Sequence, residues 1–352
     1  MAGYRRYYFP NTEALAPDEM RIIALGTGRP YVRPAQANTG WLVELGNGDK
    51  FMLDFGFGTQ MRFSALEIPY QDVTAYFASH LHTDHVGDFG QIWVASWVGG
   101  RTKPLVVYGP SGSEPKYGMK AFVEKQKESY AWDTITRVGF LPAIGEEIEV
   151  HEFDYRKTDV IYDRNGVKIT SFPAIHIFDG PVGFRLEWNG LTLVYSGDTT
   201  PNGFLIENAE GADVLIHDTY NTVEQMVERS GHDKKGGAAV NTHIHTDPYD
   251  AGKIFALVQP RLAISFHFYN DFDTSSSIER EIRKNYQGAL ALAHDLMVVN
   301  VAKDNITTRL AATGSHIYPN TANQEAYRAA PRKPRPQMSS WLSERRLFLE
   351  GK

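Results

Sequence analysis

Apolar residues between positions 20 and 80 fall in short runs that end at glycines or polar turns. The segments are "MRIIALGTGRP", "TGWLVELGNGDKFMLDFG" and "VTAYFASH", and Asn47-Gly48-Asp49 divides the second into two runs. Short apolar runs bounded by turn residues are typical of buried strands, and an Asn-Gly pair between them favours a hairpin. The pattern therefore predicts β-structure in this part of the chain.

Further along, the pattern alternates between helices and strands. Residues 89–135 mix helix-like and loop segments and are rich in aromatic residues. Strands are predicted at "GVKITSFPAIH", "VGFRLEWNGLTLVYSGDTT", "ADVLIHDTY" and "RLAISFHF", and a helix at "DPYDAGKIFALVQP". This alternation favours an α/β fold in which two sheets lie between helical layers.

Three regions follow from this pattern. Residues 20–310 are expected to form one domain, preceded by an N-terminal extension at residues 1–19. Residues 311–352 are proline-rich and basic, which is typical of an extended C-terminal arm rather than of a core. The arm either embraces a neighbouring subunit or is disordered.

The composition of the chain limits its possible partners and metal ligands. The chain has a net charge of -6, so a nucleic acid is not expected as a partner. It contains no cysteine, which leaves imidazole and carboxylate as the candidate metal ligands. No apolar run resembles a signal peptide or a membrane span, so a cytoplasmic protein without membrane association is expected.

The segment "SHLHTDHVGD" at residues 79–88 concentrates the candidate chemistry. His80 and His82 alternate at the end of a predicted strand and so point the same way, while Asp84 and His85 follow on a turn. Two metal ions about 3.5–4 Å apart need such a supply of imidazoles and carboxylates. The alternative is a solvated polar loop, but this spacing directly after an apolar strand favours a metal site.

The motif resembles the His-x-His-x-Asp-His signature of the metallo-β-lactamase superfamily. Within that superfamily the chain is similar to the ribonuclease Z-like branch, over roughly residues 20–310. The matching segments, in order, are "ALGTGRP", "MLDFGFGTQ", "VYGPSG", "VYSGDT", "LIHDTY", "HTDPYDAG" and "SFHF". The resemblance implies an αββα sandwich of two mixed sheets between helical layers, with residues 20–310 as the catalytic domain.

The resemblance also implies a set of metal ligands. His80, His82 and His176 would hold a first ion, Asp84, His85 and His267 a second, and Asp198 would bridge them. Two Zn²⁺ are expected, with Mn or Fe as other options. The alternatives are a strand-end histidine for His176, a helix cap for Asp198 and a core histidine for His267.

A hydrolytic mechanism follows from this resemblance. Two bound ions would activate a water for attack on the substrate, Asp84 would orient that water, and His245, paired with Asp218, would protonate the leaving group. His243 competes with His245 for this role. Asp54 is expected to orient a ligand histidine.

The expected substrate is a small organic molecule: an ester, a lactone, a phosphodiester or an activated aryl compound. Ribonuclease Z grips tRNA with an arm between the third motif's histidine and the following aspartate. Here Asp198 follows His176 by only 22 positions, so the arm is missing. Trp93, Trp97 and His232 are candidate pocket residues, although tryptophan is usually buried. A ribonuclease Z-type endonuclease or phosphodiesterase is the alternative.

Two further classes stay open. A di-iron redox protein of this superfamily typically has a glutamate at the position of His82 and an attached flavin domain, and this chain has neither. A non-catalytic scaffold is disfavoured by the complete ligand set. Since the branch is commonly dimeric, a homo-oligomer is expected.

Overall fold

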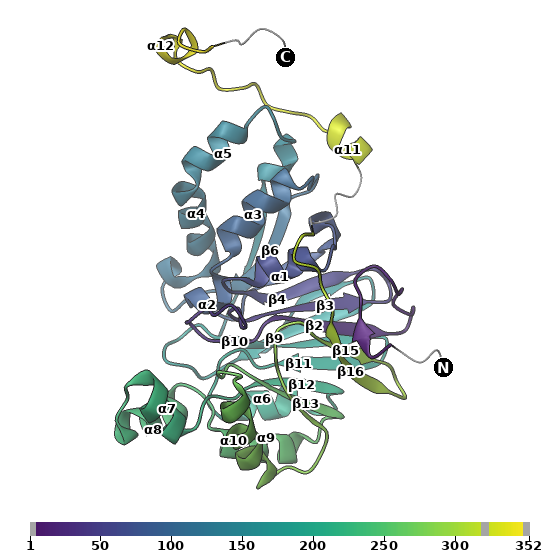
Figure 1. The fold of residues 1–352 in the computed structure, drawn as a ribbon, viewed down its shortest axis with the longest axis vertical. Helices are drawn as coiled ribbons and strands as arrows, with labels where there is room; N and C mark the ends of the chain where they lie inside the picture. Colours follow the sequence, from purple (N-terminus) through teal and green to yellow (C-terminus); the bar gives the residue numbers. More distant parts are fainter. Residues whose placement is uncertain (1–4, 318–323, 348–352) are drawn as a thin grey trace.

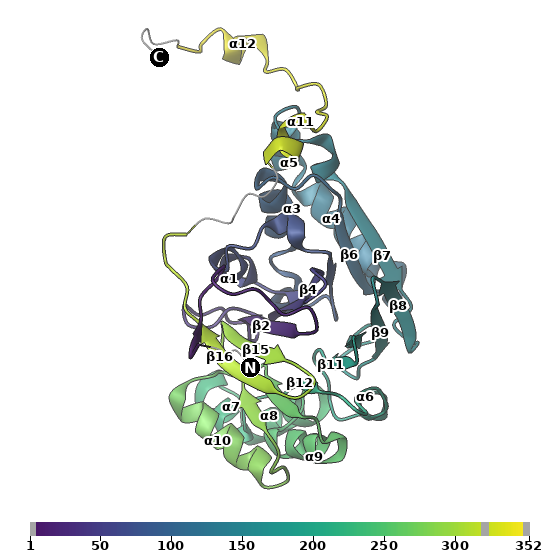
Figure 2. The ribbon, with the colours of Figure 1, turned by 90° about the vertical axis from the view of Figure 1, so that its right-hand side faces the viewer.

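The computed structural model describes residues 5–317 and 324–347. Two mixed β-sheets pack face to face, and helices cover the outer face of each (Figures 1 and 2). The αββα sandwich predicted from the sequence is confirmed. Within the described ranges, no helix is long and apolar enough to cross a membrane.

The first sheet is built around the apolar runs at the start of the chain. Its strands run in the order β1 (Tyr7–Tyr8), β16 (Ile306–Ala311), β15 (Met297–Val301), β2 (Met20–Gly26), β3 (Gly40–Leu45), β4 (Lys50–Phe55), β5 (Ala75–Phe77), β6 (Leu105–Pro110) and β7 (Ile148–Phe153). β3 and β4 form the hairpin expected around Asn47-Gly48-Asp49. The segment read as an N-terminal extension adds a strand, because Tyr7 and Tyr8 pair in parallel with β16.

The second sheet contains the later predicted strands. Its order is β14 (Leu290–Leu292), β13 (Leu262–Phe266), β12 (Val214–Asp218), β11 (Leu191–Tyr195), β10 (Val182–Trp188), β9 (Val167–Pro173) and β8 (Asp159–Arg164). β11, β12 and β13 run in parallel, so their carboxyl ends meet at one edge. That edge carries much of the candidate site.

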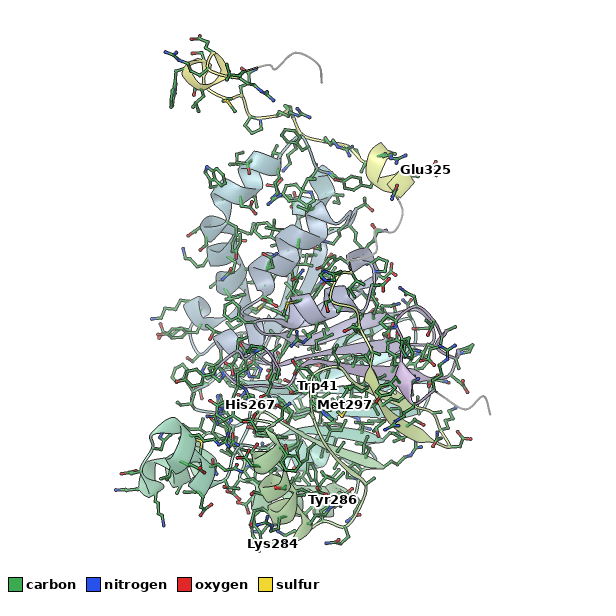
Figure 3. The ribbon with its side chains drawn as sticks, in the orientation of Figure 1. Trp41, His267, Lys284, Tyr286, Met297 and Glu325 are labelled. Carbon is green, nitrogen blue, oxygen red and sulfur yellow. The ribbon has the colours of Figure 1, made fainter. Side chains whose placement is uncertain are left out.

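The core between the sheets is apolar and contains several large aromatic side chains. Trp41 of β3 meets Phe266 of β13 edge-on at a ring-centroid distance of 6.0 Å, which joins the two sheets. Trp41 and Met297 both lie in this layer (Figure 3). Buried side chains of this size each contribute about 1.5–3 kcal/mol to stability, which holds the strand ends rigidly.

Helices pack on both outer faces. The first sheet is covered by α1 (Thr59–Ala65), α3 (Phe89–Val98) and α4 (Met119–Ser129), and the second by α6 (Gly203–Asn208), α9 (Pro248–Val258) and α10 (Phe272–Arg283). The remaining helices are α2 (Thr83–Val86), α5 (Ala131–Arg137), α7 (Val223–Ser230), α8 (Lys234–His243), α11 (Gln324–Ala329) and α12 (Ser340–Ser343), with 3-10 turns η1 (Tyr70–Asp72), η2 (Pro115–Tyr117) and η3 (Ala143–Glu146).

Candidate metal centre

The seven predicted ligands come together where strands of both sheets end. His80 and His82 follow β5, and Asp84 and His85 lie on the short helix α2. The other three follow strands of the second sheet: His176 after β9, Asp198 after β11 and His267 after β13. Strand ends give side chains a rigid base while leaving them open to a ligand.

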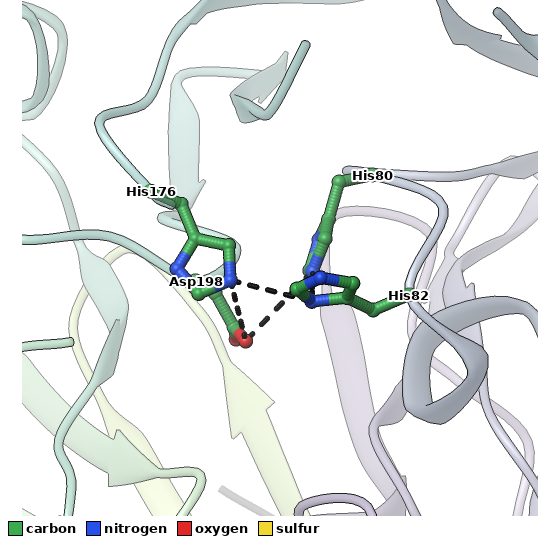
Figure 4. Close-up of side chains that lie close together, drawn as sticks. All are labelled: His80, His82, His176 and Asp198. Carbon is green, nitrogen blue, oxygen red and sulfur yellow. Dashed lines mark hydrogen bonds and ion pairs between the residues drawn. The ribbon is translucent and has the colours of Figure 1, made fainter. Parts of the chain in front are cut away.

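One cluster consists of His80, His82, His176 and Asp198 (Figure 4). His82 Nδ1 lies 3.0 Å from His80 Nε2 and 3.3 Å from His176 Nε2. Asp198 Oδ2 lies 3.9 Å from His80 Nε2 and 4.0 Å from His176 Nε2. Ligand atoms that each bind Zn²⁺ at about 2.0–2.1 Å in a tetrahedron stand roughly 3.3 Å apart, so the nitrogen spacing fits a metal.

The second cluster is fully buried and consists of Asp84, His85, Asp198 and His267. Asp198 Oδ2 lies 3.2 Å from His85 Nε2 and 3.3 Å from His267 Nε2. Among the described residues, His85 Nε2 and Asp198 Oδ1 are buried side-chain atoms with no hydrogen-bond partner. A bound cation would satisfy both atoms. Within the described part of the chain, Asp198 is the one carboxylate that belongs to both of these clusters.

Residues behind the clusters fix the orientation of the ligand rings. His85 Nδ1 donates to Asp54 Oδ2 at 2.7 Å, which leaves Nε2 as the metal-facing atom. His176 Nδ1 donates to the carbonyl oxygen of Ile244 at 2.6 Å with the same result. Such partners set the tautomer of a ligand histidine.

Asp54 also supports the strand end that carries the motif. Its carboxylate accepts hydrogen bonds from the backbone N–H and the hydroxyl of Ser79, both at 2.7 Å, and from Tyr195. Asp54 has a φ of 57° and His267 a φ of 73°, both in the left-handed region. Non-glycine residues in this region are uncommon and often mark functional sites.

A third cluster places His245 beside the metal ligands. His245 Nδ1 donates to Asp218 Oδ2 at 2.9 Å and lies 3.9 Å from Asp198 Oδ2. Its competitor His243 is exposed at the end of α8. The structure therefore brings His245 and Asp218 together at the site and leaves His243 outside it.

Sequence reasoning missed the stack that supports His245. The ring of Tyr220 lies parallel to that of His245, with centroids 4.2 Å apart and an interplanar angle of 3°. The guanidinium of Arg29 lies 4.1 Å from the centre of the Tyr220 ring. The signal was present, since "LGTGRP" and "IHDTY" are both matching segments, but nothing in the sequence shows that their side chains stack.

Burial and charge set the protonation of the ligands. Burial lowers the pKa of His80 well below its ordinary value and that of His176 to about 4, so both rings are neutral near pH 7. Burial raises the pKa of Asp198, but the neighbouring His267 and His85 outweigh this and hold it well below its usual range. Neutral imidazole and ionised carboxylate are the forms that bind metals. Burial lowers the pKa of His85, but the carboxylates of Asp198, Asp54 and Asp84 outweigh burial and raise it well above its ordinary value, so this ring must release a proton when an ion binds.

Burial and a neighbouring carboxylate also have opposite effects on the pKa of His245. Burial lowers its pKa, but the charge and hydrogen bond of Asp218 outweigh burial and raise it above the ordinary value. A raised pKa keeps a proton available on this ring near neutral pH, as the predicted role in leaving-group protonation requires.

A cavity of about 610 Å³ opens on the first cluster. Its walls come from the segment around η2 and α4 and from the loop after β9. The lining residues are His80, Leu81, His82, Pro110, Ser111, Lys116, Tyr117, Ala121, Phe122, Lys125, His176, Ile177, Phe178, Asp179, Gly180 and Pro181. A volume of this size is typical of small-molecule sites.

The predicted pocket tryptophans do not line this cavity. Trp93 and Trp97 are 2% and 0% exposed. Their indole N–H groups donate to the carbonyl oxygens of Glu146 and Pro142, at 3.0 and 2.7 Å. His232 is exposed in the loop between α7 and α8 and is also absent from the cavity wall. The structure therefore places these three candidate pocket residues outside this cavity.

The fold and the His/Asp cluster define a metal-dependent hydrolase of the metallo-β-lactamase fold, similar to ribonuclease Z. The model of the family described as anti-Pycsar protein Apyc1 matches residues 20–230, and the chain belongs to this family. The expected superfamily and enzyme class are thereby confirmed.

Three relatives illustrate the similarity. Ribonuclease Z of Mycobacterium marinum (strain ATCC BAA-535 / M) is 34% identical over 205 residues, which cover 56% of this chain and 70% of the relative. The metallo-β-lactamase fold protein YhfI of Bacillus subtilis superposes with a TM-score of 0.60 at 19% identity, covering 81% of this chain and 100% of the other. The short form of human tRNase Z (ELAC1) gives 0.58 at 19% identity, covering 79% and 98%.

Removing metal is expected to destabilise the fold, because it leaves buried ligand atoms without partners. A ligand present at about 1,000 times its Kd adds about 4 kcal/mol, which for a chain of this length corresponds to a Tm shift of about 5 °C. The measurement is differential scanning calorimetry before and after dialysis against a chelator, and again after Zn²⁺ is added back. A Tm that stays unchanged while the metal content falls would contradict the site.

Proposed function

We propose that the protein is a dinuclear zinc hydrolase that cleaves a phosphodiester bond in a small organic substrate carrying an aromatic group. The observation that carries this proposal is the cavity, which joins the histidines of the first cluster to aromatic walls and to two lysines. The other organic classes that the ligand set allows, esters, lactones and activated aryl compounds, are outcomes of the test below.

The aromatic walls favour a substrate with a flat apolar part. Tyr117 and Phe178 both line the cavity and pack edge-to-face with ring centroids 5.9 Å apart, and Phe122 is a third aromatic lining residue. Tyr117 and Phe178 are both substantially exposed in this structure. A planar group that packs against these rings buries apolar surface and gains an aromatic contact of about 0.5–1.5 kcal/mol.

Two basic side chains and the sequence similarity to a ribonuclease support a phosphodiester as the bond that is cleaved. Lys116 and Lys125 line the cavity. Their ammonium groups pair with Glu114 at 3.0 Å and Glu128 at 2.9 Å, and an anionic substrate would compete with these exposed carboxylates for them. The Mycobacterium marinum relative is a ribonuclease, and ribonucleases cleave phosphodiester bonds. Both observations favour a phosphodiester over a neutral ester or lactone.

The side chains have defined roles in this reaction. When bound, two divalent ions supply Lewis acidity and lower the pKa of water. Asp198 bridges the two clusters, and Asp84 is placed to orient the attacking water. Asp218 holds Nδ1 of His245, so that Nε2 is the ring atom left to transfer a proton to the leaving oxygen.

A ribonuclease Z-type endonuclease is the second candidate, favoured by the 34% identity to ribonuclease Z. Against it, the chain between His176 and Asp198 forms only the β10–β11 hairpin and has no tRNA-gripping arm. The net charge of -6 also disfavours a long polyanion, since phosphate contacts dominate nucleic-acid affinity.

The test is a substrate panel on the metal-loaded protein. The panel contains bis-p-nitrophenyl phosphate, a dinucleotide, a cyclic mononucleotide, an aryl ester, a lactone, an aryl sulfate, a chlorinated aromatic nitrile and a precursor tRNA. Turnover of small phosphodiesters is expected. Cleavage confined to the tRNA would favour the endonuclease, and turnover confined to the ester, lactone, sulfate or nitrile would overturn the phosphodiester assignment.

Shortening the aromatic wall tests the pocket separately. Phe178→Ala is expected to raise KM about tenfold, the equivalent of 1.4 kcal/mol, while kcat changes little, because the ring contacts the substrate rather than the reacting bond. Phe204→Ala, on α6 and outside the cavity, is the control. Equal KM values for the two variants would contradict the assignment of this cavity to the substrate.

A further inference from the structure

Tyr220 packs flat against the ring of the proposed proton donor. Its ring centroid lies 4.2 Å from that of His245, at an interplanar angle of 3°. Both side chains are buried, at 8% and 7% exposure. The tyrosine ring therefore forms a flat wall along one face of the imidazole.

The backbone around both residues is fixed independently of this contact. The N–H of Tyr220 donates to the carbonyl oxygen of Thr246 at 2.9 Å, and the N–H of His245 donates to that of Val240 at 3.0 Å. The Thr246 hydroxyl donates to the carbonyl oxygen of Thr199, next to the bridging aspartate, at 2.7 Å. The chain on either side of His245 is thus anchored, and rotation of the side chain is the freedom that remains.

A single hydrogen bond leaves the ring of His245 free to tilt. Its Nδ1 donates to Asp218 Oδ2 at 2.9 Å, which fixes one ring atom. The torsion that turns a histidine ring is broad, so a tilt about this bond would carry Nε2 away from the substrate. The rings of His176 and His267 have centroids 4.9 Å from that of His245, but they are inclined at 52° and 34°. Among the rings that the structure describes, Tyr220 is the one that lies parallel to His245 and restricts this tilt.

Tyr220 is itself held by a buried arginine. The guanidinium of Arg29 lies 4.1 Å from the centre of the Tyr220 ring. Because His245 occupies one face of that ring, the guanidinium covers the other. Arg29 also lies 4.1 Å from the centre of the Tyr269 ring, and its Nη1 donates to Asn221 Oδ1 at 3.3 Å. Cation–π contacts are strongest when the cation is removed from water, as it is here at 3% exposure.

We infer that Tyr220 is a positioning residue for proton transfer: together with Asp218 it fixes the plane of His245 and directs Nε2 at the leaving oxygen. The inference rests on the proposed phosphodiester hydrolysis. In that step a bond forms between phosphorus and the oxygen of the attacking water, and the bond to the leaving oxygen breaks. The leaving oxygen keeps the electron pair and takes the proton from Nε2, and the proton released by the water restores the ring.

The identity of the leaving group distinguishes this role from a merely structural one. A p-nitrophenolate leaves readily without a proton, whereas a phenolate is more basic and needs one in the transition state. Loss of a positioned acid therefore slows the phenolate substrate selectively. Damage to the metal centre or to substrate binding slows both substrates.

The experiment compares methyl p-nitrophenyl phosphate with methyl phenyl phosphate on the zinc-loaded protein. Tyr220→Leu is expected to lower kcat for the phenyl diester about 100-fold and kcat for the p-nitrophenyl diester less than about threefold, since a positioned acid contributes about 10²–10⁴-fold. KM and the zinc content are expected to stay close to the native values. Tyr220→Phe keeps the ring and is expected to show native rates on both diesters.

Two further variants calibrate this comparison. His245→Gln removes the proton donor itself and is expected to show the same preference for the p-nitrophenyl diester, at least as strongly. Tyr286→Leu is the matched control, because Tyr286 is also a buried tyrosine, but it packs on Phe255 outside the three clusters. The control is expected to lose stability without changing the ratio of the two rates.

A second measurement reports on the ring of His245 without turnover. In NMR spectra of the zinc-loaded, histidine-labelled protein, the His245 signals are those absent from His245→Gln. The stacked Tyr220 ring shields the proton on Cε1, and Asp218 holds the proton on Nδ1. In Tyr220→Leu the Cε1 proton is expected to move downfield and the Nδ1 proton to broaden, while both signals stay in place in Tyr220→Phe.

The inference is overturned if Tyr220→Leu slows both diesters equally or slows neither, or if the His245 signals do not respond. It is also overturned if Tyr220→Phe loses as much activity as Tyr220→Leu, which would assign the hydroxyl a direct contact with the substrate. A His245→Gln protein without a leaving-group preference would overturn the proton donor and the inference with it. A native protein that hydrolyses neither diester would contradict the proposed function instead, and the NMR comparison alone would then decide whether Tyr220 fixes the ring.

Discussion

Asp198→Ala is expected to remove both metal and activity from this protein. The Asp198 carboxylate is the only side chain in the described residues that belongs to all three His/Asp clusters. It would offset the charge that two divalent ions bring into a buried site, and its removal takes away the carboxylate that lies 3.2 Å from His85 Nε2 and 3.3 Å from His267 Nε2. Metal content is expected to fall from about two per chain to one or none.

The activity loss follows from the metal loss. Changes to residues behind metal ligands typically cost about 10–100-fold, so removal of a shared ligand is expected to cost at least about 1,000-fold in kcat/KM. The measurements are elemental analysis and steady-state kinetics on the best substrate of the panel.

Asp213→Ala provides the control. Asp213 precedes β12 and pairs with Arg261 at 2.8 Å, outside the three clusters. This control is expected to keep its metal. An Asp198→Ala protein that retains two ions per chain would show that the clusters do not bind metal as inferred.

The layers of the fold and the positions of the ligands were predictable because both depend on local patterns. An apolar run followed directly by "HLHTDH" places imidazoles at a strand end, and the same holds for His267 after "LAISF". Strands that end at one edge of a sandwich bring such residues together. The distances among His82, His176 and Asp198 depend on how the two sheets pack against each other. No local sequence pattern shows this packing.

The lining of the cavity could not be predicted from the sequence, for a physical reason. Trp93 and Trp97 lie on α3, which begins only one residue after the motif, but both indoles turn inward toward the core or the segment around η3. Nearness in sequence does not determine which face of a helix a side chain occupies. The rings that line the cavity, Tyr117 and Phe178, come from segments about sixty residues apart and meet only in the fold.

The histidine that pairs with Asp218 shows the same limit of sequence reasoning. His243 and His245 are two residues apart, and spacing alone allowed either one to assist the reaction. The structure distinguishes them because α8 ends at His243, after which the chain turns and directs His245 to Asp218. Arg29 and Tyr220, which stack behind His245, could be recognised only in the folded structure.

Asp54→Asn is expected to weaken metal binding while the fold survives. Asparagine has nearly the same volume and tolerates the left-handed φ of 57° at this position. It replaces a carboxylate oxygen with an NH₂ group, so one of the donors from His85, Ser79 and Tyr195 meets another donor. If that donor is His85, its ring is driven to the tautomer that carries a proton on the metal-facing Nε2.

The expected cost is about 10–100-fold in metal affinity or activity, as for other partners of ligand histidines. Asp54→Ala removes all acceptors and leaves the buried N–H of Ser79 unpaired, so it is expected to lose a further 1–3 kcal/mol or so of stability. Metal affinity from competition with a chromogenic chelator, together with thermal unfolding, separates the two effects.

Asp88→Asn is the matched control for this position. Asp88 is also a buried carboxylate that accepts a backbone N–H, from Gln60 at 2.8 Å, and it closes the same "SHLHTDHVGD" segment. It contacts the start of α1 instead of a metal ligand, so its change is expected to affect stability but not metal affinity. Equal metal affinities for Asp54→Asn and the native protein would show that the orientation of His85 does not depend on this carboxylate. A loss in Asp54→Asn alone would establish that the charge behind His85, rather than burial of an aspartate in general, prepares the ring to bind metal.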